Sequence, residues 1–417
     1  MGLIDCLLVF LIACLALKSS FVLGSDPSPL QDFCVAIDES NHEAVYVNGK
    51  FCKNPKNVTA DDFYLSGFDV PSNASNPFRS NTTLGTVDQI PGLNTLGISV
   101  FRADLKPKGI IPLHGHPRGS EIVIVMEGCL YVGFVTSDPN NQLMAKHLKP
   151  GDVFVFPPGL VHFLYNDGDT DAVVYAAANS QNPDITTARV FRNVPVEVLS
   201  KSFNAERKVI EEIIKGISIP LIRDLCVAIN DLKDAVLVNG KLCKDPSLVT
   251  TNDFFLPGFD KPGNTSNAFG SGMTPATIDQ IPGRNGQGIS LVRIDFAPKG
   301  VLPMSYRGEG SQILLVMEGT LYVGFVTSDP ANRLISKVLH KGDVYALPQG
   351  FPYVIYNVNH TCNAVAIVAI NNQSPYFFSI KAIFGSEPTI AVEFLAKSFK
   401  LDEKEIEVAL KQWKMDE

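Results

Sequence analysis

The chain has few charged residues and no basic patch. Lys, Arg, Asp and Glu make up 19% of its 417 residues, and the net charge is −8. This balance argues against nucleic acid and anionic membrane surfaces as partners. Low-complexity segments are lacking, and no apolar run beyond residue 24 is long enough to span a membrane. Apolar residues nevertheless reach 45%, so a chain of this length can bury a core in each of two or more domains.

The first residues predict export. An apolar run from Cys6 to Leu17 is too short to cross a bilayer comfortably, and small residues and Pro27 follow it. We interpret residues 1–24 as a secretory signal peptide, with an N-terminal membrane anchor as the alternative. The mature chain is then expected to be extracellular and free of the membrane. Six N-x-Ser/Thr sequons agree with this route and predict a glycoprotein: Asn57, Asn73, Asn81, Asn264, Asn359 and Asn372, of which Asn372 is disfavoured by the nearby Pro375.

The chain has eight cysteines, of which Cys6 and Cys14 lie in the predicted signal peptide, and the spacing of four others repeats. Two matching segments, "DFCVAIDESNHEAVYVNGKFCK" and "DLCVAINDLKDAVLVNGKLCK", each contain a short-range pair: Cys34 with Cys52, and Cys226 with Cys243. In a secreted chain this pattern predicts two disulfides. Cys129 and Cys362 do not form a repeated pair. We expect them to be single buried thiols, and a bridge between them remains the alternative.

The same unit occurs twice. "VMEGCLYVGFVTSDP" returns as "VMEGTLYVGFVTSDP", and "TVDQIPGLNTLGIS" returns as "TIDQIPGRNGQGIS". The period is too long for a solenoid and indicates two domains, 25–216 and 217–417. Short strands rich in Val, Ile, Tyr and Phe, punctuated by Gly and Pro, predict an all-β barrel or sandwich in each. Each copy ends in a helical pattern, 204–216 and 402–414, which packs either on a neighbouring subunit or domain or on its own barrel.

The side chains that could bind a metal ion lie in the first copy of the repeat. In "HGHPRGSE", His114 and His116 are two apart in a segment with strand character, so both imidazoles share one face. Glu121 then opens the next strand, and His162 follows a Pro-Gly turn beside another strand. Three imidazoles and a carboxylate without thiolate speak against a structural cysteine-type zinc site. They suit Mn, Fe, Cu or Ni with positions left for water or substrate.

These motifs resemble a known family. "HGHPRGSE" and the pattern G-x5-P-x-G-x2-H-x3-N from Gly151 to Asn166 are similar to the two cupin motifs. One departure is Lys108, where the first motif usually has glycine. "PLQDFCVA" and "VNGKFCK" narrow the resemblance to the plant germin-like proteins. The resemblance implies two cupin β-barrels, apoplastic location, and a manganese ion held by four ligands: His114, His116, Glu121 and His162.

The resemblance also bears on activity. Some germin-like proteins oxidise oxalate, some dismutate superoxide and some hydrolyse nucleotide sugars. Phe101 and Ile111 stand where oxalate-oxidising members have asparagines, which disfavours oxalate oxidation. Superoxide dismutation requires fewer substrate-binding groups in the pocket, because its chief requirement is a redox-active ion with an open coordination position. It is therefore the leading prediction. The rival class is a non-enzymatic extracellular binding or structural protein. No phosphate loop supports nucleotide-sugar hydrolysis.

The second copy has lost every predicted ligand. The repeats align without gaps through both motifs, and the four positions become Ser305, Arg307, Gln312 and Tyr353. We therefore expect one manganese ion per chain. The second barrel is either a structural partner, a metal-free pocket in which Arg307 holds an anion, or a decaying copy. Because germin-like proteins often form trimers of dimers, three such chains are expected to assemble into six barrels.

Overall fold

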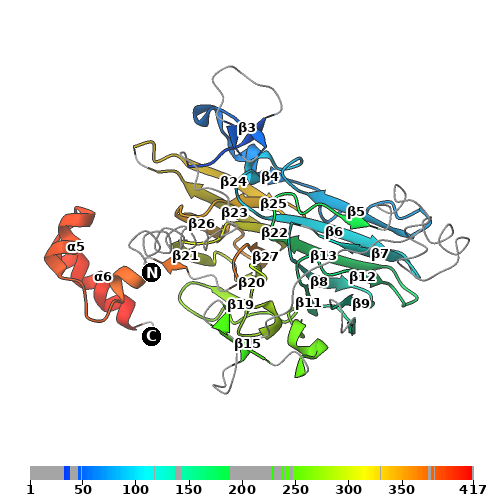
Figure 1. Cartoon of the computed structure of the whole chain (residues 1–417). Helices are drawn as coiled ribbons and strands as arrows, with labels where there is room; N and C mark the ends of the chain where they lie inside the picture. The colour runs from blue at the N-terminus through cyan, green and yellow to red at the C-terminus, as the bar shows by residue number, and fades with distance from the viewer. Residues whose placement is uncertain are drawn as a thin grey trace, which may run out of the picture.

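The computed structural model describes residues 32–37, 46–47, 49–116, 118–136, 142–187, 228–229, 237–238, 241–244, 248–328, 330–373, 377–379 and 381–415. In these segments the two repeats form two antiparallel β-barrels that lie side by side (Figure 1). The all-β prediction is confirmed. No described helix has the length and apolarity to cross a membrane. The predicted signal peptide and the predicted helix 204–216 lie outside the described residues.

The first barrel consists of two facing sheets. The six-stranded sheet has the order β18-β11-β8-β13-β6-β5 and the five-stranded sheet the order β10-β9-β12-β7-β14. The bounds in chain order are β5 Ser80–Gly85, β6 Ser99–Leu105, β7 Ile110–Gly115, β8 Glu121–Glu127, β9 Leu130–Val135, β10 Leu143–Leu148, β11 Val153–Phe156, β12 His162–Tyr165, β13 Ala172–Ala178, β14 Thr186–Thr187 and β18 Phe255–Leu256.

The second barrel repeats this plan. Its sheets have the orders β19-β20-β27-β22-β25-β4 and β24-β23-β26-β21-β28. The bounds are β4 Tyr64–Leu65, β19 Ser271–Ala276, β20 Ser290–Phe296, β21 Val301–Tyr306, β22 Gln312–Glu318, β23 Thr320–Val326, β24 Leu334–His340, β25 Val344–Leu347, β26 Tyr353–Asn357, β27 Ala364–Ile370 and β28 Phe378–Ser379.

The two repeats exchange strands. β4 of the first repeat pairs with β25 of the second barrel, and β18 of the second repeat pairs with β11 of the first barrel. The preceding aromatic residues follow the same path: Phe63 packs edge-on against Phe325, and Phe254 packs edge-on against Phe134. The N-terminal segment of each repeat therefore completes the barrel of the other repeat.

The exchange explains a motif glycine. Gly151 has a φ of +84°, and a Cβ there would lie 2.3 Å from the carboxylate of Asp260. The backbone N–H of Phe259 donates to the Gly151 carbonyl at 2.8 Å. Gly342 makes the equivalent contacts with Asp69 in the other barrel. Both the left-handed backbone and the crossing segment exclude a side chain at these positions.

The barrels meet through the outer faces of their six-stranded sheets. In β8, Val123 and Val125 point into the first barrel, whereas Ile122 and Ile124 belong to the core shared with the second barrel. Alternate residues of a strand face opposite sides, so a sheet covered on both sides needs apolar residues at nearly every position. This is why the sequence "EIVIV" shows no alternation.

Smaller elements flank the barrels. Two three-stranded sheets contain β1 Ala36–Ile37, β2 Tyr46–Val47 and β3 Lys50–Cys52, and β15 Ala228–Ile229, β16 Leu237–Val238 and β17 Lys241–Cys243. The 3-10 helices are η1 Pro55–Asn57, η2 Ala60–Phe63, η3 Pro91–Leu93, η6 Thr251–Phe254 and η7 Pro282–Arg284. The predicted disulfide between Cys34 and Cys52 is formed. Its counterpart stays a prediction, because Cys226 lies outside the described residues.

The two remaining cysteines differ from expectation. Cys129 and Cys362 are free thiols, and both are exposed rather than buried. Each sits in a turn between strands: Cys129 lies between β8 and β9, and Cys362 between β26 and β27. Turn positions at the ends of a barrel face solvent, so the expectation of buried thiols was wrong, and no bridge joins the two.

The C-terminal helices form a small unit of their own. They are α4 Lys381–Phe384, α5 Val392–Phe399 and α6 Glu403–Met415, and they lie beside the second barrel in Figure 1. α6 confirms the helix predicted from residue 402. The buried residues of this unit form a cluster separate from both barrel cores: Phe384, Leu395, Ala396, Ile406 and Leu410. Within the described residues, the helices pack chiefly on each other.

The exchanged strands provide a matched pair of substitutions. The hydroxyl of Tyr64 donates to Asp343 Oδ1 at 2.9 Å. The equivalent Phe255 has no hydroxyl, and Asp152 Oδ1 is buried without a hydrogen-bond partner in the part of the chain that the structure describes. Tyr64→Phe should lower the free energy of unfolding by about 1.5 kcal/mol, and Phe255→Tyr should raise it. Denaturant unfolding measures both. The same sign of change in both variants would show that the hydroxyl does not stabilise the two equivalent positions in the same way.

Candidate metal centre

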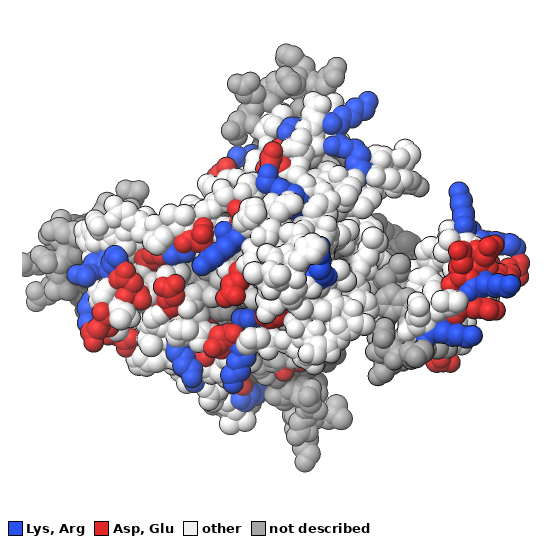
Figure 2. All heavy atoms as spheres, turned by 180° about the vertical axis from the view of Figure 1, so that it is seen from behind, with Lys and Arg blue, Asp and Glu red and all other residues white. Residues whose placement is uncertain are grey.

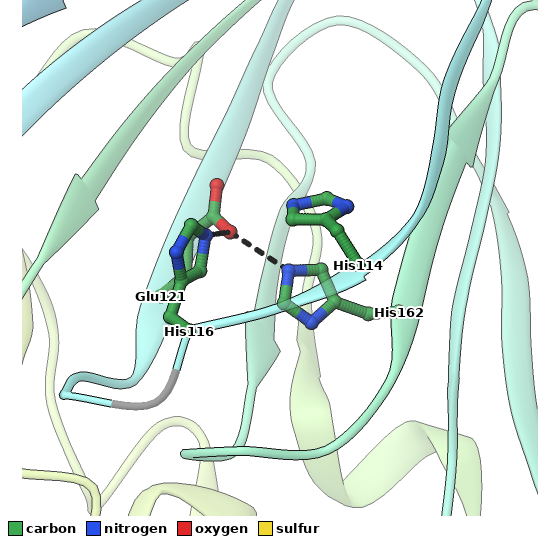
Figure 3. Close-up of side chains that lie close together, drawn as sticks. All are labelled: His114, His116, Glu121 and His162. Carbon is green, nitrogen blue, oxygen red and sulfur yellow. Dashed lines mark hydrogen bonds and ion pairs between the residues drawn. The ribbon is translucent and has the colours of Figure 1, made fainter. Parts of the chain in front are cut away.

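The four predicted ligands come together inside the first barrel (Figure 3). Their ligand atoms lie within 4.8 Å of one another, and all four side chains are buried. His114 is on β7, His116 directly follows β7, Glu121 begins β8 and His162 begins β12. The predicted grouping of three imidazoles and one carboxylate is therefore present.

Strand register explains the grouping. His114 and His162 are direct partners on the neighbouring antiparallel strands β7 and β12, so their side chains share the inner face. Glu121 comes from β8 in the opposite, six-stranded sheet. The two sheets of the barrel thus contribute histidines from one side and a carboxylate from the other.

Backbone carbonyls orient the three imidazoles. Each Nδ1 lies within hydrogen-bond distance of a carbonyl oxygen: His114 with Pro112 at 2.8 Å, His162 with Leu160 at 2.9 Å and His116 with Asp184 at 2.6 Å. A carbonyl can only accept, so Nδ1 is the protonated nitrogen. In the neutral imidazole, Nε2 is then the nitrogen with the lone pair for a metal ion, and outer hydrogen bonds of this kind fix the tautomer and the ring of a metal ligand.

The carboxylate lies between two imidazoles. Glu121 Oε2 is 3.0 Å from His116 Nε2 and 3.1 Å from His162 Nε2. Burial opposes the charge of Glu121, but these hydrogen bonds and the imidazole charges hold its pKa well below the usual range. Burial also opposes the charge of His116, yet its hydrogen bond to Glu121 and the carboxylate charge raise its pKa. A metal ion would replace the protons through which Nε2 of His116 and His162 contact Glu121.

His114 is neutral at physiological pH. Burial, followed by the neighbouring His162, lowers its pKa to about 3. A neutral imidazole and an ionised carboxylate are the forms that bind metals. The donor set, its protonation and its burial all fit a divalent transition metal.

Apolar rings surround the centre. Phe156 stacks on His162 with ring centroids 4.5 Å apart, and Phe101 lies parallel to His116 at 6.4 Å. Phe101 is buried and Ile111 is half-buried on β7. The two positions at which the resemblance implies asparagine in oxalate-oxidising members are thus apolar here.

The second barrel keeps the geometry but not the ligands. Ser305 and Tyr353 are cross-strand partners, as His114 and His162 are in the first barrel. The four substituted side chains are all buried: Ser305, Arg307, Gln312 and Tyr353. The Tyr353 hydroxyl hydrogen-bonds with Ser305 and Gln312, and Arg307 lies over the ring of Phe377. Burial lowers the pKa of the Arg307 guanidinium, and none of the four side chains is an imidazole or a carboxylate.

The sequence did not reveal the residues that support the ligands. Asp184 acts through its backbone carbonyl, which any residue could supply. Arg118 holds the segment around it: Nε donates to the Asn182 carbonyl at 3.0 Å, and a terminal nitrogen lies 3.2 Å from the Asp184 carboxylate. Neither a backbone carbonyl nor a surface arginine has a signal in a single sequence that would mark it as a support of the ligands.

The pKa of His114 gives a pH dependence. The ordinary value is 6.5 and the folded value about 3, so between them only the unfolded chain takes up this proton. The metal-free protein should therefore lose stability as pH falls through this window, by up to about 1.4 kcal/mol per pH unit. Below pH 4.5 the lowered pKa of Glu121 adds a loss of the same sign. Well below pH 6.5, His116 is protonated in both states, because its pKa is raised, and adds no slope. Near pH 6.5 only the folded chain holds this proton fully, so His116 there adds a slope of the opposite sign.

Urea unfolding of chelator-treated protein at several pH values measures this slope. His114→Gln removes the titrating group and should flatten the slope between pH 6.5 and 4.5, whose limits are the ordinary values for His114 and Glu121. An unchanged slope in this variant would show that other groups govern acid unfolding.

Comparisons with known proteins agree with this geometry. Residues 66–211 and 258–407 both match the family model described as Cupin. Germin-like protein subfamily 1 member 20 of Arabidopsis thaliana is 53% identical over 207 residues, which are 48% of this chain and 92% of that protein. Subfamily 1 member 5 from the same plant is 54% identical over 208 residues, with the same coverage of 48% and 92%. Such relatives correspond to one of the two repeats.

A solved structure shares the two-barrel arrangement. Oxalate decarboxylase from Bacillus subtilis has a TM-score of 0.64 at 15% identity, over 84% of this chain and 86% of that chain. At this identity the likeness concerns the fold alone. The family match in both repeats and the high identity to single-copy relatives go further: this chain belongs to the germin-like proteins of the cupin family, as a tandem form with two barrels.

Proposed function

We propose that the chain is a secreted germin-like bicupin that binds one manganese ion in its first barrel and dismutates superoxide. The observation that carries the proposal is the buried set of three histidines and Glu121, each imidazole oriented by a backbone carbonyl. Four nitrogen and oxygen donors without thiolate suit manganese. They leave coordination positions open for a small oxygen species.

The residues of the chain have separate tasks in this mechanism. Manganese, when bound, supplies one-electron oxidation and reduction. The Nδ1–carbonyl bonds keep each imidazole in the tautomer whose Nε2 faces the centre. Glu121 contributes the negative charge that balances the cation, and water supplies the protons. The apolar Phe101 and Ile111 offer no polar group to a dicarboxylate, which favours superoxide over oxalate as substrate.

Two other functions remain as rivals. In a non-enzymatic extracellular protein, the same metal would mainly stiffen the first barrel and add linked stability. Nucleotide-sugar hydrolysis occurs in some relatives, but no phosphate-binding loop or dedicated base in the sequence supports it.

Exposed sequons support secretion as a glycoprotein: Asn57, Asn73, Asn81 and Asn264 are exposed, and Asn359 is half-buried.

Metal analysis tests the first half of the proposal. The purified chain should hold about one manganese ion, because the second barrel has neither imidazole nor carboxylate at the equivalent positions. His116→Ala should lose most of the metal, and Arg307→Ala, the matched change in the second barrel, should keep it. Two ions per chain would contradict the asymmetry.

A dismutase assay on the same proteins tests the second half. Wild type and Arg307→Ala should be active, and His116→Ala should lose activity in proportion to its metal. If a fully loaded wild type shows no activity above free manganese, the metal has the structural role of the rival function.

The proposal extends to assembly as a trimer of chains, which places six barrels in one particle. The C-terminal helices and the link between them expose apolar side chains: Phe394 on α5 by 63%, Val408 on α6 by 55% and Leu401 in the link by 49%. Exposed apolar surface of this kind marks protein interfaces. On the face shown in Figure 2, acidic and basic residues lie next to one another over the barrels, and the C-terminal helices carry a group of acidic residues edged by basic ones. The helices therefore suit contacts between copies of the chain.

Light scattering tests the assembly. Wild type should have the mass of three chains, and Phe394→Asp on α5 should lower it, because a charge would be buried in the contact. Lys404→Asp, at an exposed charged position of α6, is the control and should leave the mass unchanged. A monomeric wild type would contradict the trimer.

A further inference from the structure

The residue before Glu121 is held by the second barrel. Ser120 is fully buried; its N–H donates to Asn179 Oδ1 at 2.8 Å, and its hydroxyl donates to the backbone carbonyl of Gln287. Asn179 Nδ2 donates to the same carbonyl at 2.9 Å. These bonds close a ring of three residues directly behind a metal ligand, and one of the three belongs to the other repeat.

Gln287 offers this carbonyl from a short turn before β20. Its own N–H donates to the carbonyl of Arg284 at 2.9 Å, and both residues are buried. A carbonyl in such a turn has little freedom to move. The second barrel thus presents a fixed acceptor to the segment that leads into Glu121.

The equivalent contact, made by the second barrel with the first repeat, is incomplete. Ser311 and Asn371 are the equivalents of Ser120 and Asn179, and Leu96 is the equivalent of Gln287. Asn371 Nδ2 donates to the Leu96 carbonyl at 2.7 Å. Among the described residues, however, Asn371 Oδ1 is buried without a hydrogen-bond partner. The same residue types therefore form a closed ring behind Glu121 and an open one behind Gln312.

We infer that the second barrel positions the metal centre: the Gln287 carbonyl, through Ser120 and Asn179, fixes the carboxylate of Glu121. Ser120 and Asn179 are positioning residues, since neither reaches the ligand atoms. Loss of a partner that hydrogen-bonds a ligand directly weakens metal affinity about 10- to 100-fold. Ser120 and Asn179 act one residue further out, so the low end of this range applies to them. This gives the ligand-free barrel a role at the site itself, and it rests on the proposed metal binding of the first barrel.

The chain provides its own control. Ser120→Ala and Ser311→Ala remove the same hydroxyl from equivalent buried positions of one interface, only one of which precedes a ligand. Asn179→Ala and Asn371→Ala form a second matched pair in case a serine variant does not fold. The probe is MnCl2 added to the chelator-treated full-length chain, with affinity from calorimetry, the Mn(II) spectrum from electron paramagnetic resonance, and thermal unfolding without metal as the measure of folding.

We expect Ser120→Ala to weaken manganese binding by about 10-fold and to change the resonance spectrum. Ser311→Ala should bind within a factor of two of wild type with an unchanged spectrum. If both variants bind like wild type, or both lose affinity equally, the ring only stabilises the interface and the inference is wrong. If wild type itself binds no manganese, the proposed function fails first, and the inference falls with it.

Discussion

The structure depends on one contact, the packing of the outer faces of two six-stranded sheets against each other. Residues such as Ile122 and Ile124 face the partner barrel, while Val123 and Val125 fill their own. A sheet with both faces covered can be apolar throughout and still fold in water. The exchange of β4 and β18 follows from this contact, because each short strand needs only to cross to the adjacent sheet edge.

The same contact allows the two barrels to carry different side chains inside. The scaffold residues that form turns and accept the exchanged segment, such as Gly151 and Gly342, are present in both copies. The inner positions are free to differ, because the interface lies on the opposite face of the strands. One interior therefore holds three imidazoles and a carboxylate, and the other a buried polar set around Arg307.

Much of this could be predicted from the sequence because it rests on local pattern. The repeat, the strands, the ligand set and the disulfide between Cys34 and Cys52 follow from spacing and from the family resemblance, and the structure contains them. The prediction that Cys129 and Cys362 are buried was wrong, because both lie in exposed turns, although free cysteines are usually buried. Strand exchange was not predictable either, since the short strands carry the same residues whichever barrel they join.

The sequence by itself determined which barrel can hold a metal, because side-chain chemistry decides whether a lone pair is available for an ion. Only the tertiary structure decided what surrounds the ligands. The carbonyl of Asp184 that orients His116, and the carbonyl of Gln287 that reaches Ser120, are backbone groups present at every residue. Their roles come from position in space, and the pairing of two barrels in one chain sets that position.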